Sequence, residues 1–348
     1  MWNRLTCGCR RFGLPLTLVV LAFAALARIH AVENESAGVA AQQENDPRFD
    51  AALIANSTAK PKPLRILVIG AHPADVFDQS GGTMAHHVKR GDWVGCVVVT
   101  TGTRVHDKVI ADEMQHRKEI PKEDELKKTM AQRAGVKEKE VIHACSILGV
   151  REQDVHFLGI DDMALLVNEP TIRRLATLIR KLRPNVVLTH LPSEDGGFEA
   201  GHATTGQMVV NAVNLAAGVD PGDETPPHRV TQVFFFGQGS SGPRTHLWGS
   251  QGGYYNDVFV DITDVADKKV ACLDAMESQG YGGAYARKRI ETSDGAFGAK
   301  IRVAYAEGFI SLYSTTNYYL PVSEIDLQHS KSSDHESIQR RSYRVSVP

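Results

Sequence analysis

The sequence predicts an α/β fold of the Rossmann-like type, in which a parallel sheet carries helices on both faces. Short apolar runs alternate with stretches of helical periodicity that are ten or more residues long. The apolar runs are continuous, which is typical of strands that are buried on both faces. Glycine or proline marks the points at which several of these segments stop.

The first part of the chain contains two of the predicted strands. Arg65–Gly70 has the sequence RILVIG, and the valine-rich run Trp93–Thr100 follows a helix predicted over about Gly81–Arg90. The next stretch, Arg104–Glu140, is highly charged, which predicts helix and loop on the solvent-exposed surface. A lid over a substrate is the alternative for this stretch.

The rest of the chain repeats the pattern of strands and helices. Further strands are predicted at Asp154–Leu158, Val186–Thr189, Thr231–Phe236 and Val258–Ile262. Further helices are predicted at Glu140–Leu148, Thr171–Leu182, His202–Ala217 and Val265–Gln279. Strands that are separated by helices favour parallel pairing, because a parallel connection needs a crossover of a dozen or more residues.

Both ends of the chain are expected to lie outside the folded domain, residues 63–327. Residues 1–31 are typical of an export signal, because three arginines precede an apolar run of 16 residues and small residues follow it. Such a run is shorter than the roughly 20 residues of a membrane span, so cleavage and export without a stable span are expected. Residues 32–62 are predicted to be a polar linker, and 328–348 a disordered tail.

Charge and cysteine content argue against two classes of protein. Loss of residues 1–31 removes four arginines and no acid, which takes the formal charge from −2 to about −6 and disfavours nucleic-acid binding. The remaining cysteines, Cys96, Cys145 and Cys272, lack CxxC spacing, so no disulfide framework is expected. Cys96 and Cys145 lie in apolar patterns and are predicted to be core thiols. The oligomeric state is left open.

The carboxyl ends of parallel strands are the usual ligand-binding edge of such a sheet. After the first strand, His72 and Asp75 lie three residues apart across a proline, which allows an imidazole and a carboxylate to meet on one cation. A hydrogen-bonding pair is the alternative. The loop after Val186–Thr189 contains two histidines and three acids, namely His190, Glu194, Asp195, Glu199 and His202.

Together the two loops offer a zinc ion two nitrogens and one oxygen, with a position left open for water. A flexible polar loop is the alternative for the second loop taken alone. His190 fits a structural role as well as a functional one. His86 and His87, inside the first predicted helix, are not expected to be ligands.

The first loop resembles the signature of the LmbE-like, or PIG-L, family. Residues 71–83, AHPADVFDQSGGT, resemble the family's A-H-P-D-D-E...G-G-T motif, with departures at Ala74 and Val76. Residues 201–204, GHAT, resemble the end of its H-P-D-H-R-A-T motif. The resemblance extends over about residues 64–312 through Lys137-x-x-Glu140 with Ile147–Val150, His156–Gly159, Lys269 with Ser278–Gln279, and Tyr305–Phe309.

The resemblance implies an LmbE-like fold and a zinc-dependent hydrolase that removes acetyl groups from N-acetylglucosamine-type amides of amino sugars or their conjugates. It also implies that His72, Asp75 and His202 hold Zn²⁺, or another divalent metal. In this chemistry a carboxylate takes the proton of a metal-activated water, and a nearby donor stabilises the tetrahedral oxyanion.

The family's acid-base residues are altered in this chain. Ala74 stands where the family has its general base, Glu199 where it has the first His of H-P-D-H, and Met276 where it has the His of H-x-S-Q. Loss of general-base help typically costs about 10²- to 10⁴-fold in rate. Glu199 is favoured as a relocated base, and a solvated loop glutamate is its alternative. Asp78 is the other candidate base, and Asp195 a candidate partner that orients a ligand histidine.

Two hypotheses follow from this pattern. The preferred one is an exported metal-dependent amidohydrolase, an N-deacetylase of an amino sugar or glycoconjugate, that uses a repositioned base. The alternative is a metal-retaining carbohydrate-binding pseudoenzyme with weak or no activity. Ala74 and Met276 favour the alternative, whereas the density of acids in the second loop favours the enzyme.

Overall fold

The computed structural model describes residues 62–162, 165–193, 200–237, 256–317 and 319–345. The chain divides into two units, residues 1–60 with 316–321 and residues 61–315 with 322–348. Residues 316–317 and 319–321 are the described part of the first unit, and all that follows concerns the second. The predicted signal, the linker up to residue 61, Asp195 and Glu199 lie outside the described residues. None of the described helices is long and apolar enough to cross a membrane.

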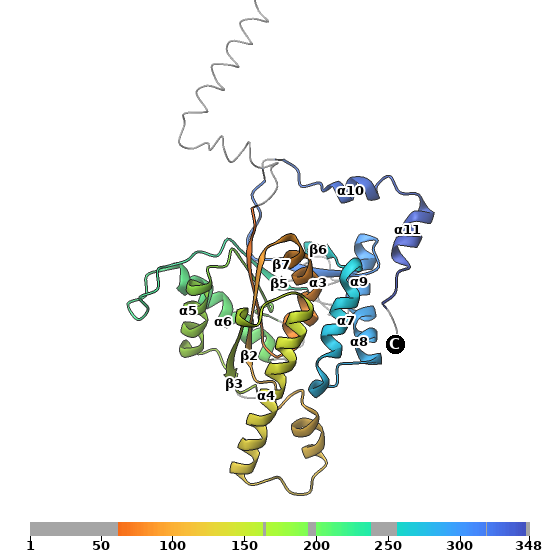
Figure 1. Cartoon of the computed structure of the whole chain (residues 1–348). Helices are drawn as coiled ribbons and strands as arrows, with labels where there is room; N and C mark the ends of the chain where they lie inside the picture. The colour runs from red at the N-terminus through yellow and green to blue at the C-terminus, as the bar shows by residue number, and fades with distance from the viewer. Residues whose placement is uncertain (1–61, 163–164, 194–199, 238–255, 318, 346–348) are drawn as a thin grey trace, which may run out of the picture. The chain divides into compact units, whose positions relative to one another are not determined.

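The core of the second unit is a sheet of seven strands in the order β3-β2-β1-β4-β5-β7-β6 (Figure 1). Its strands are β1 (Arg65–Gly70), β2 (Trp93–Thr100), β3 (Val155–Ile160), β4 (Val186–Thr189), β5 (Gln232–Phe236), β6 (Val258–Asp261) and β7 (Ala306–Ser311). The first five strands pair in parallel, as predicted. However, β7 pairs antiparallel with both β5 and β6, so the sheet is mixed.

The extra strand β7 is missing from the predicted elements for a physical reason. Its sequence, AEGFIS, contains a glutamate and a glycine, so it is not a continuous apolar run. Glu307 is nevertheless 1% exposed, because partners from distant parts of the chain satisfy its carboxylate. A strand whose burial depends on such distant partners gives no local signal.

Helices cover both faces of the sheet, as expected for this fold class (Figure 1). The main helices are α3 (Asp75–Arg90), α4 (Glu123–Ile147), α5 (Glu169–Leu182), α6 (Ala200–Ala217), α7 (Ala266–Asp274), α8 (Ala284–Thr292) and α9 (Asp294–Ile301). In β1, Ile66 and Val68 pack with α3, α4 and α7, whereas Leu67 and Ile69 pack with α5 and α6. Burial on both faces explains why the strand is a continuous apolar run.

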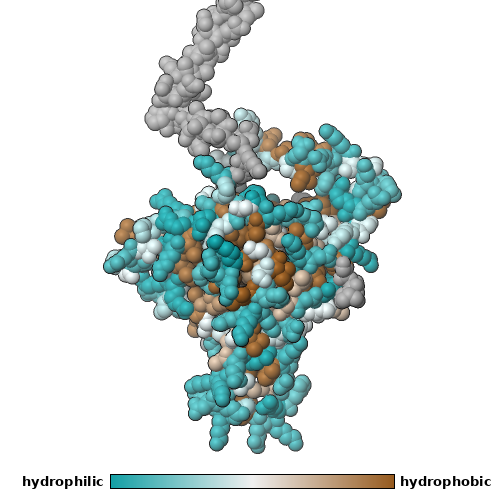
Figure 2. Space-filling model, viewed as in Figure 1, coloured by the Kyte–Doolittle hydropathy of each residue, from teal (hydrophilic) through white to brown (hydrophobic). Residues whose placement is uncertain are grey.

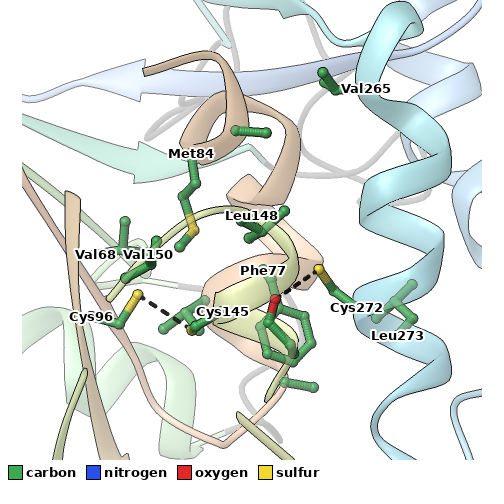
Figure 3. Close-up of a cluster of buried hydrophobic side chains, with 14 of the residues drawn as sticks. Val68, Phe77, Met84, Cys96, Cys145, Leu148, Val150, Val265, Cys272 and Leu273 are labelled. Carbon is green, nitrogen blue, oxygen red and sulfur yellow. Dashed lines mark hydrogen bonds between the residues drawn. The ribbon is translucent and has the colours of Figure 1, made fainter. Parts of the chain in front are cut away.

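The three cysteines of this unit belong to the core, as predicted for Cys96 and Cys145 (Figure 3). All are free thiols with no exposed surface. The sulfurs of Cys96 on β2 and Cys145 on α4 lie 3.8 Å apart, and the Cys272 thiol donates a hydrogen bond of 3.2 Å to the carbonyl of Ala144. The hydrogen bond with the Cys145 thiol, followed by burial, raises the pKa of Cys96 well above its ordinary value, which keeps it protonated.

The charged stretch after β2 forms a projection that contains a π-helical segment, Lys108–Glu113, and the start of α4. Figure 2 shows that hydrophilic residues cover this projection, which agrees with the predicted surface role. In contrast, the tail predicted to be disordered, residues 328–348, contains helix α11 (Asp334–Arg341) and the end of helix α10 (Glu324–His329). Each begins with a serine whose side chain and a following acid form a capping box, a local stabilisation that the composition argument overlooked.

Candidate metal centre

The candidate centre lies at the carboxyl edge of the sheet, where the direction of the strand order changes. β1 has β2 on one side and β4 on the other, so the loops that follow β1 and β4 diverge to opposite faces, which is the usual ligand-binding position in such a sheet. His72 and Asp75 come from the loop after β1, and His202 lies in the first turn of α6, which follows β4. The two predicted loops therefore meet, although they are 130 residues apart in sequence.

The three predicted ligands converge on one point. His72 Nδ1 lies 3.2 Å from His202 Nε2 and 3.3 Å from Asp75 Oδ2, and His202 Nε2 lies 3.4 Å from the same carboxylate oxygen. One potential ligand atom from each residue therefore lies within 4.8 Å of the others, an arrangement that could hold a metal ion. His72 and Asp75 are buried, and His202 is partly exposed.

The turn between β1 and α3 holds the Asp75 carboxylate in place. Asp75 is the first residue of α3, and its Oδ2 accepts a hydrogen bond of 2.7 Å from the backbone N–H of His72. Burial alone would raise the pKa of Asp75, but the charges of His202 and His72 and hydrogen bonds from His190 and His202 bring it well below its ordinary value. The carboxylate is therefore ionised and available as a ligand.

His190, which directly follows β4, supports this carboxylate. Its Nε2 lies 3.1 Å from Asp75 Oδ2 and 3.0 Å from the backbone nitrogen of Ala71, and its ring stacks on that of His202 at 4.2 Å between centroids. Nε2 can donate to Asp75 only when it carries a proton, and can accept from Ala71 only when it does not. The Nε2 atom of His190 thus either donates to the Asp75 carboxylate and orients it, or accepts from the backbone of the loop after β1.

The structure provides no acid at the position of the family's general base. Ala74 is 1% exposed and forms the N-cap of α3. Asp78, the alternative base, is one helical turn further on, but both of its carboxylate oxygens bind the guanidinium group of Arg289 on α8. Because both oxygens of Asp78 pair with Arg289, they do not fit the role of general base that is the alternative for this residue. Asp195 and Glu199 fall outside the described residues.

The two histidines that were expected not to be ligands point to other partners. His86 Nε2 lies 2.6 Å from Asp264, and His87 Nδ1 lies 2.6 Å from Asp92. Both sit in the second half of α3, away from the strand ends, so the described histidines of the centre are His72, His190 and His202, with His106 beside them.

Sequence reasoning missed His106, Tyr281 and Arg289 beside the centre. The His106 ring packs edge-on against His72 at 5.8 Å and lies 6.3 Å from the Tyr281 ring. Arg289 lies over the Tyr281 ring at 5.9 Å. Burial, followed by the negative charges of Asp75 and Asp78, raises the pKa of Tyr281, so its hydroxyl stays protonated. Only His106 had a local signal, since it follows the end of β2 at the same sheet edge.

A first buried ion network fixes the loop that contains His106. Lys137 on α4 is 1% exposed and donates to the carbonyl of His106 at 2.6 Å and to Ser278 Oγ at 3.1 Å. Asp107 lies 3.3 Å from the same ammonium group. Glu140, one turn along α4, accepts hydrogen bonds from both the backbone and the hydroxyl of Ser278. The Lys137-x-x-Glu140 segment thus joins the loop after β2 to the segment before Tyr281.

A second buried network fixes α3, which carries Asp75. α3 is interrupted at Ser80 (φ −146°), and the free backbone N–H groups of Gly82 and Thr83 donate to the two carboxylate oxygens of Glu307 at 2.8 Å. Lys269, with no exposed surface, bridges Glu307 and Asp294 at 2.8 and 2.9 Å. Glu307, which lies on β7, therefore caps the second half of α3.

Comparisons with known proteins agree with this geometry. Residues 67–213 match the sequence model of a family described as PIG-L: GlcNAc-PI de-N-acetylase. The chain is 27% identical over 216 residues to the 4-oxalmesaconate hydratase of Pseudomonas putida, covering 61% of this chain and 73% of that protein. It is 32% identical over 181 residues to a 1D-myo-inositol 2-acetamido-2-deoxy-alpha-D-glucopyranoside deacetylase of Thermomonospora curvata, covering 47% and 56%.

A solved structure extends the comparison to the fold. The conserved protein TT1542 of Thermus thermophilus is 26% identical and has a TM-score of 0.56 to this chain. The match covers 75% of this chain and 99% of that one. The fold is thus shared beyond the stretch that matches the family model.

Proposed function

Because residues 67–213 form a PIG-L (LmbE-like) domain, we propose that this chain is an exported, metal-dependent N-deacetylase of an N-acetylglucosamine-type amino sugar or conjugate. The observation that carries the proposal is the convergence of His72, Asp75 and His202 at the strand switch point. Two imidazoles and one carboxylate are a common ligand set of catalytic zinc. Export rests on the pattern of residues 1–31, and cell fractionation with sequencing of the mature amino terminus tests it.

The residues of the centre fit a divalent metal because they offer three convergent donors, of which the carboxylate is already ionised. A bound zinc ion would supply Lewis acidity to a substrate carbonyl and to water. The chain itself contributes orientation: His72 N–H and His190 fix the Asp75 carboxylate, and the Lys137 network fixes the loop after β2.

The proton acceptor for the attacking water is assigned to Glu199. Ala74 has no group that accepts a proton, and Asp78 is occupied by Arg289. In the sequence Glu199 immediately precedes α6, whose first turn carries His202, and this nearness to a proposed ligand supports the assignment. A carboxylate there suits proton abstraction, whereas it would repel a developing oxyanion.

A second candidate function is the addition of water to a carbon–carbon double bond. It is favoured by one observation, the 27% identity to a hydratase over 73% of that protein's length. Both reactions use an activated water beside a carbonyl group, so the ligand set alone is compatible with either. A metal-retaining carbohydrate-binding protein without turnover is the third outcome, and Ala74 favours it.

The deciding experiment measures acetate release from N-acetylglucosamine and its glycosides by the zinc-loaded protein. Three variants accompany the parent: Glu199→Gln, Glu194→Gln as a matched control in the same loop, and Ala74→Asp. Loss of activity in Glu199→Gln but not in Glu194→Gln, by about 10²-fold or more, supports the relocated base.

Other outcomes identify the alternatives. A parent that releases no acetate while Ala74→Asp gains this activity is a binding protein that lost its base. A parent protein that releases no acetate but consumes 4-oxalmesaconate is a hydratase, and loss of the conjugated absorbance of this substrate measures the consumption. Equal activity in Glu199→Gln and the parent rejects the assignment of Glu199.

A further inference from the structure

A continuous row of aromatic rings leads outward from the candidate metal centre. His202 and His72 are 5.1 Å apart between ring centroids, and His72 and His106 are 5.8 Å apart. His106 lies 6.3 Å from Tyr281, which lies 5.4 Å from Tyr285. The last three rings of the row come from two separate parts of the chain: His106 from the loop after β2, and Tyr281 and Tyr285 from the segment before α8 and its first turn.

These three rings are not simply part of the core. His106 is exposed, and Tyr285 keeps 49% of its surface, whereas Tyr281 packs one part of its ring against the core and is partly exposed. The backbone around Tyr281 is shaped by Gly280 (φ 74°) and Gly283 (φ 68°), both in the left-handed region that favours glycine. The fold therefore holds an aromatic surface open to solvent directly beside the proposed ligands.

The charges around this surface indicate the kind of ligand that it suits. Arg289, which lies over the Tyr281 ring, has its guanidinium group paired with Asp78, and Lys137, which donates to the carbonyl of His106, is paired with Asp107. The exposed Lys108 is at the rim, with its Cε 3.4 Å from the position that a Cβ on Gly280 would occupy. A polycarboxylate needs several available cations, and among the described residues named here only Lys108 is outside these ion pairs. An uncharged ring suits the surface better.

We infer that His106, Tyr281 and Tyr285 form the subsite that binds the sugar ring of the substrate, by stacking on its apolar face. The inference rests on the proposed function, because it places the sugar ring on these side chains while the amide group of the same substrate reaches the metal centre. Aromatic side chains combine a large apolar surface with polar edges, as the two faces and the hydroxyl groups of a pyranose require. Tyr281 and Tyr285 are thereby specificity-determining residues, and neither takes part in the chemical step.

The test measures binding rather than turnover. The zinc-loaded full chain is titrated with N-acetylglucosamine, with N-methylacetamide, which has the amide but no ring, and with tricarballylate, a tricarboxylate. The variants are Tyr285→Ala, Tyr281→Phe, which keeps the ring, and Lys108→Gln. Tyr313→Ala removes an exposed tyrosine (41%) outside the row and serves as the matched control. Saturation-transfer NMR follows the ligand protons, and thermal melting confirms folding.

We expect Tyr285→Ala to weaken N-acetylglucosamine binding about 3- to 10-fold, the range of one aromatic contact. Lys108→Gln and Tyr313→Ala should bind as the parent does, and Tyr281→Phe should weaken binding less than Tyr285→Ala because it keeps the ring. Saturation transfer should be strongest for protons of one ring face. In steady-state kinetics, KM should rise in Tyr285→Ala while kcat stays within about twofold.

Three results would overturn the inference. The first is an unchanged affinity of Tyr285→Ala for N-acetylglucosamine, and the second is a loss of affinity in Tyr281→Phe equal to that in Tyr285→Ala. The third is tighter binding of tricarballylate than of N-acetylglucosamine, together with loss of tricarballylate binding in Lys108→Gln. A chain that binds the sugar through these rings but releases no acetate upholds the subsite and rejects the proposed reaction. A chain that releases acetate while Tyr285→Ala binds the sugar as the parent does upholds the proposed reaction and rejects the subsite.

Discussion

Lys269 is a single residue on which the position of α3 depends. Its ammonium group has no exposed surface and lies between the carboxylates of Asp294 and Glu307. Burial opposes the charged form of the lysine, but both carboxylates outweigh it and raise its pKa. Removing the cation leaves both acids buried without a cationic partner, and one of them, Glu307, is the acid that caps the second half of α3.

We expect Lys269→Met to lower the free energy of unfolding by about 3–5 kcal/mol, the usual cost of leaving a buried charge unpaired. Urea denaturation followed by circular dichroism measures it. Lys268→Met is the matched control, since Lys268 is the preceding residue of α7 and is exposed. Partial recovery of stability in the double variant Lys269→Met/Asp294→Asn would show that the unpaired acid causes the loss. Equal loss of stability in Lys269→Met and Lys268→Met would contradict this explanation.

Asp92 provides a prediction for pH dependence. Its carboxylate accepts from the backbone N–H of Leu64 and pairs with His87 and Arg90, which joins the start of β1 to the end of α3. Burial raises its pKa, but these hydrogen bonds and the charge of Arg90 lower it below the ordinary value of 3.8. A lowered folded pKa means that ionised Asp92 stabilises the fold above about pH 4, and that this contribution is lost as pH falls.

Asp92→Asn should therefore cost about 1.5–3 kcal/mol at pH 7, the range for hydrogen bonds to a charged group. The difference between parent and variant should shrink as the pH falls below about 4. Urea titrations at pH 7, 5 and 3 measure both. Asp112→Asn, at an exposed aspartate, should show no such pH-dependent difference, and a constant gap for Asp92→Asn at all three pH values would reject the ionisation argument.

At the scale of single residues, the sequence predicts what strand ends bring together. His72, Asp75 and His202 could be grouped because loops at one sheet edge meet regardless of their separation along the chain. The pairing of Asp78 with Arg289 could not, since it joins α3 to α8 across 211 residues and no periodicity encodes it. Tyr281 was missed for the same reason.

Among the elements, α3 shows how close packing constrains a sequence. A Cβ atom on Gly82 would lie 2.4 Å from Cγ2 and 2.6 Å from Cβ of Ile262, whereas Gly135 on α4 has no atom within 4 Å of that position. Both glycines lie within helices, so the same substitution tests packing at one site and helix propensity at the other.

Gly82→Ala should destabilise the fold by about 1–3 kcal/mol, because an overpacked site forces its neighbours to shift. Gly135→Ala should instead stabilise it by about 0.5–1 kcal/mol, because alanine loses less conformational entropy on forming a helix. Urea denaturation of the two variants gives both values. A neutral Gly82→Ala would show that Ile262 can move aside.

The bounds of the elements were predictable where the signal is local. β1, β2 and β4 begin and end at the predicted residues, since apolar runs between charged residues, glycines and prolines define them. α3 begins six residues before its predicted start, because Ser80 and the following glycines break the helical pattern, and the distant Glu307 caps the second half of the helix. Glu307 also explains why β7 is not among the predicted strands, because this glutamate interrupts the apolar run of β7.

For the whole molecule, the parallel half of the sheet and the helices on both faces follow from the alternation of segments, whereas the strand order and the antiparallel half do not. The centre lies between β1 and β4, so a metal bound there would join the loops that extend from both halves of the parallel sheet. It would stabilise the folded state by mass action, provided that the unfolded chain does not bind it.

Zinc at about 100 times its Kd should therefore add about 2.7 kcal/mol to the free energy of unfolding and raise the Tm by several degrees. Differential scanning fluorimetry with and without a chelator measures the shift. His72→Ala should abolish it, and His86→Ala, which pairs with Asp264 outside the centre, should leave it intact. Equal shifts in the two variants would show that the ion binds elsewhere.

The place of β7 in the sheet affects how this protein is made. In the described sheet β6 is the outermost strand, and its only neighbour is β7, which is synthesised about 50 residues later. At translation speeds of about 5–20 residues per second, β6 emerges roughly 3–10 s before the strand that will hold it. During that interval β5 and β6 present unpaired edges on the ribosome, and this is when we expect the nascent chain to be most prone to aggregate and to recruit chaperones.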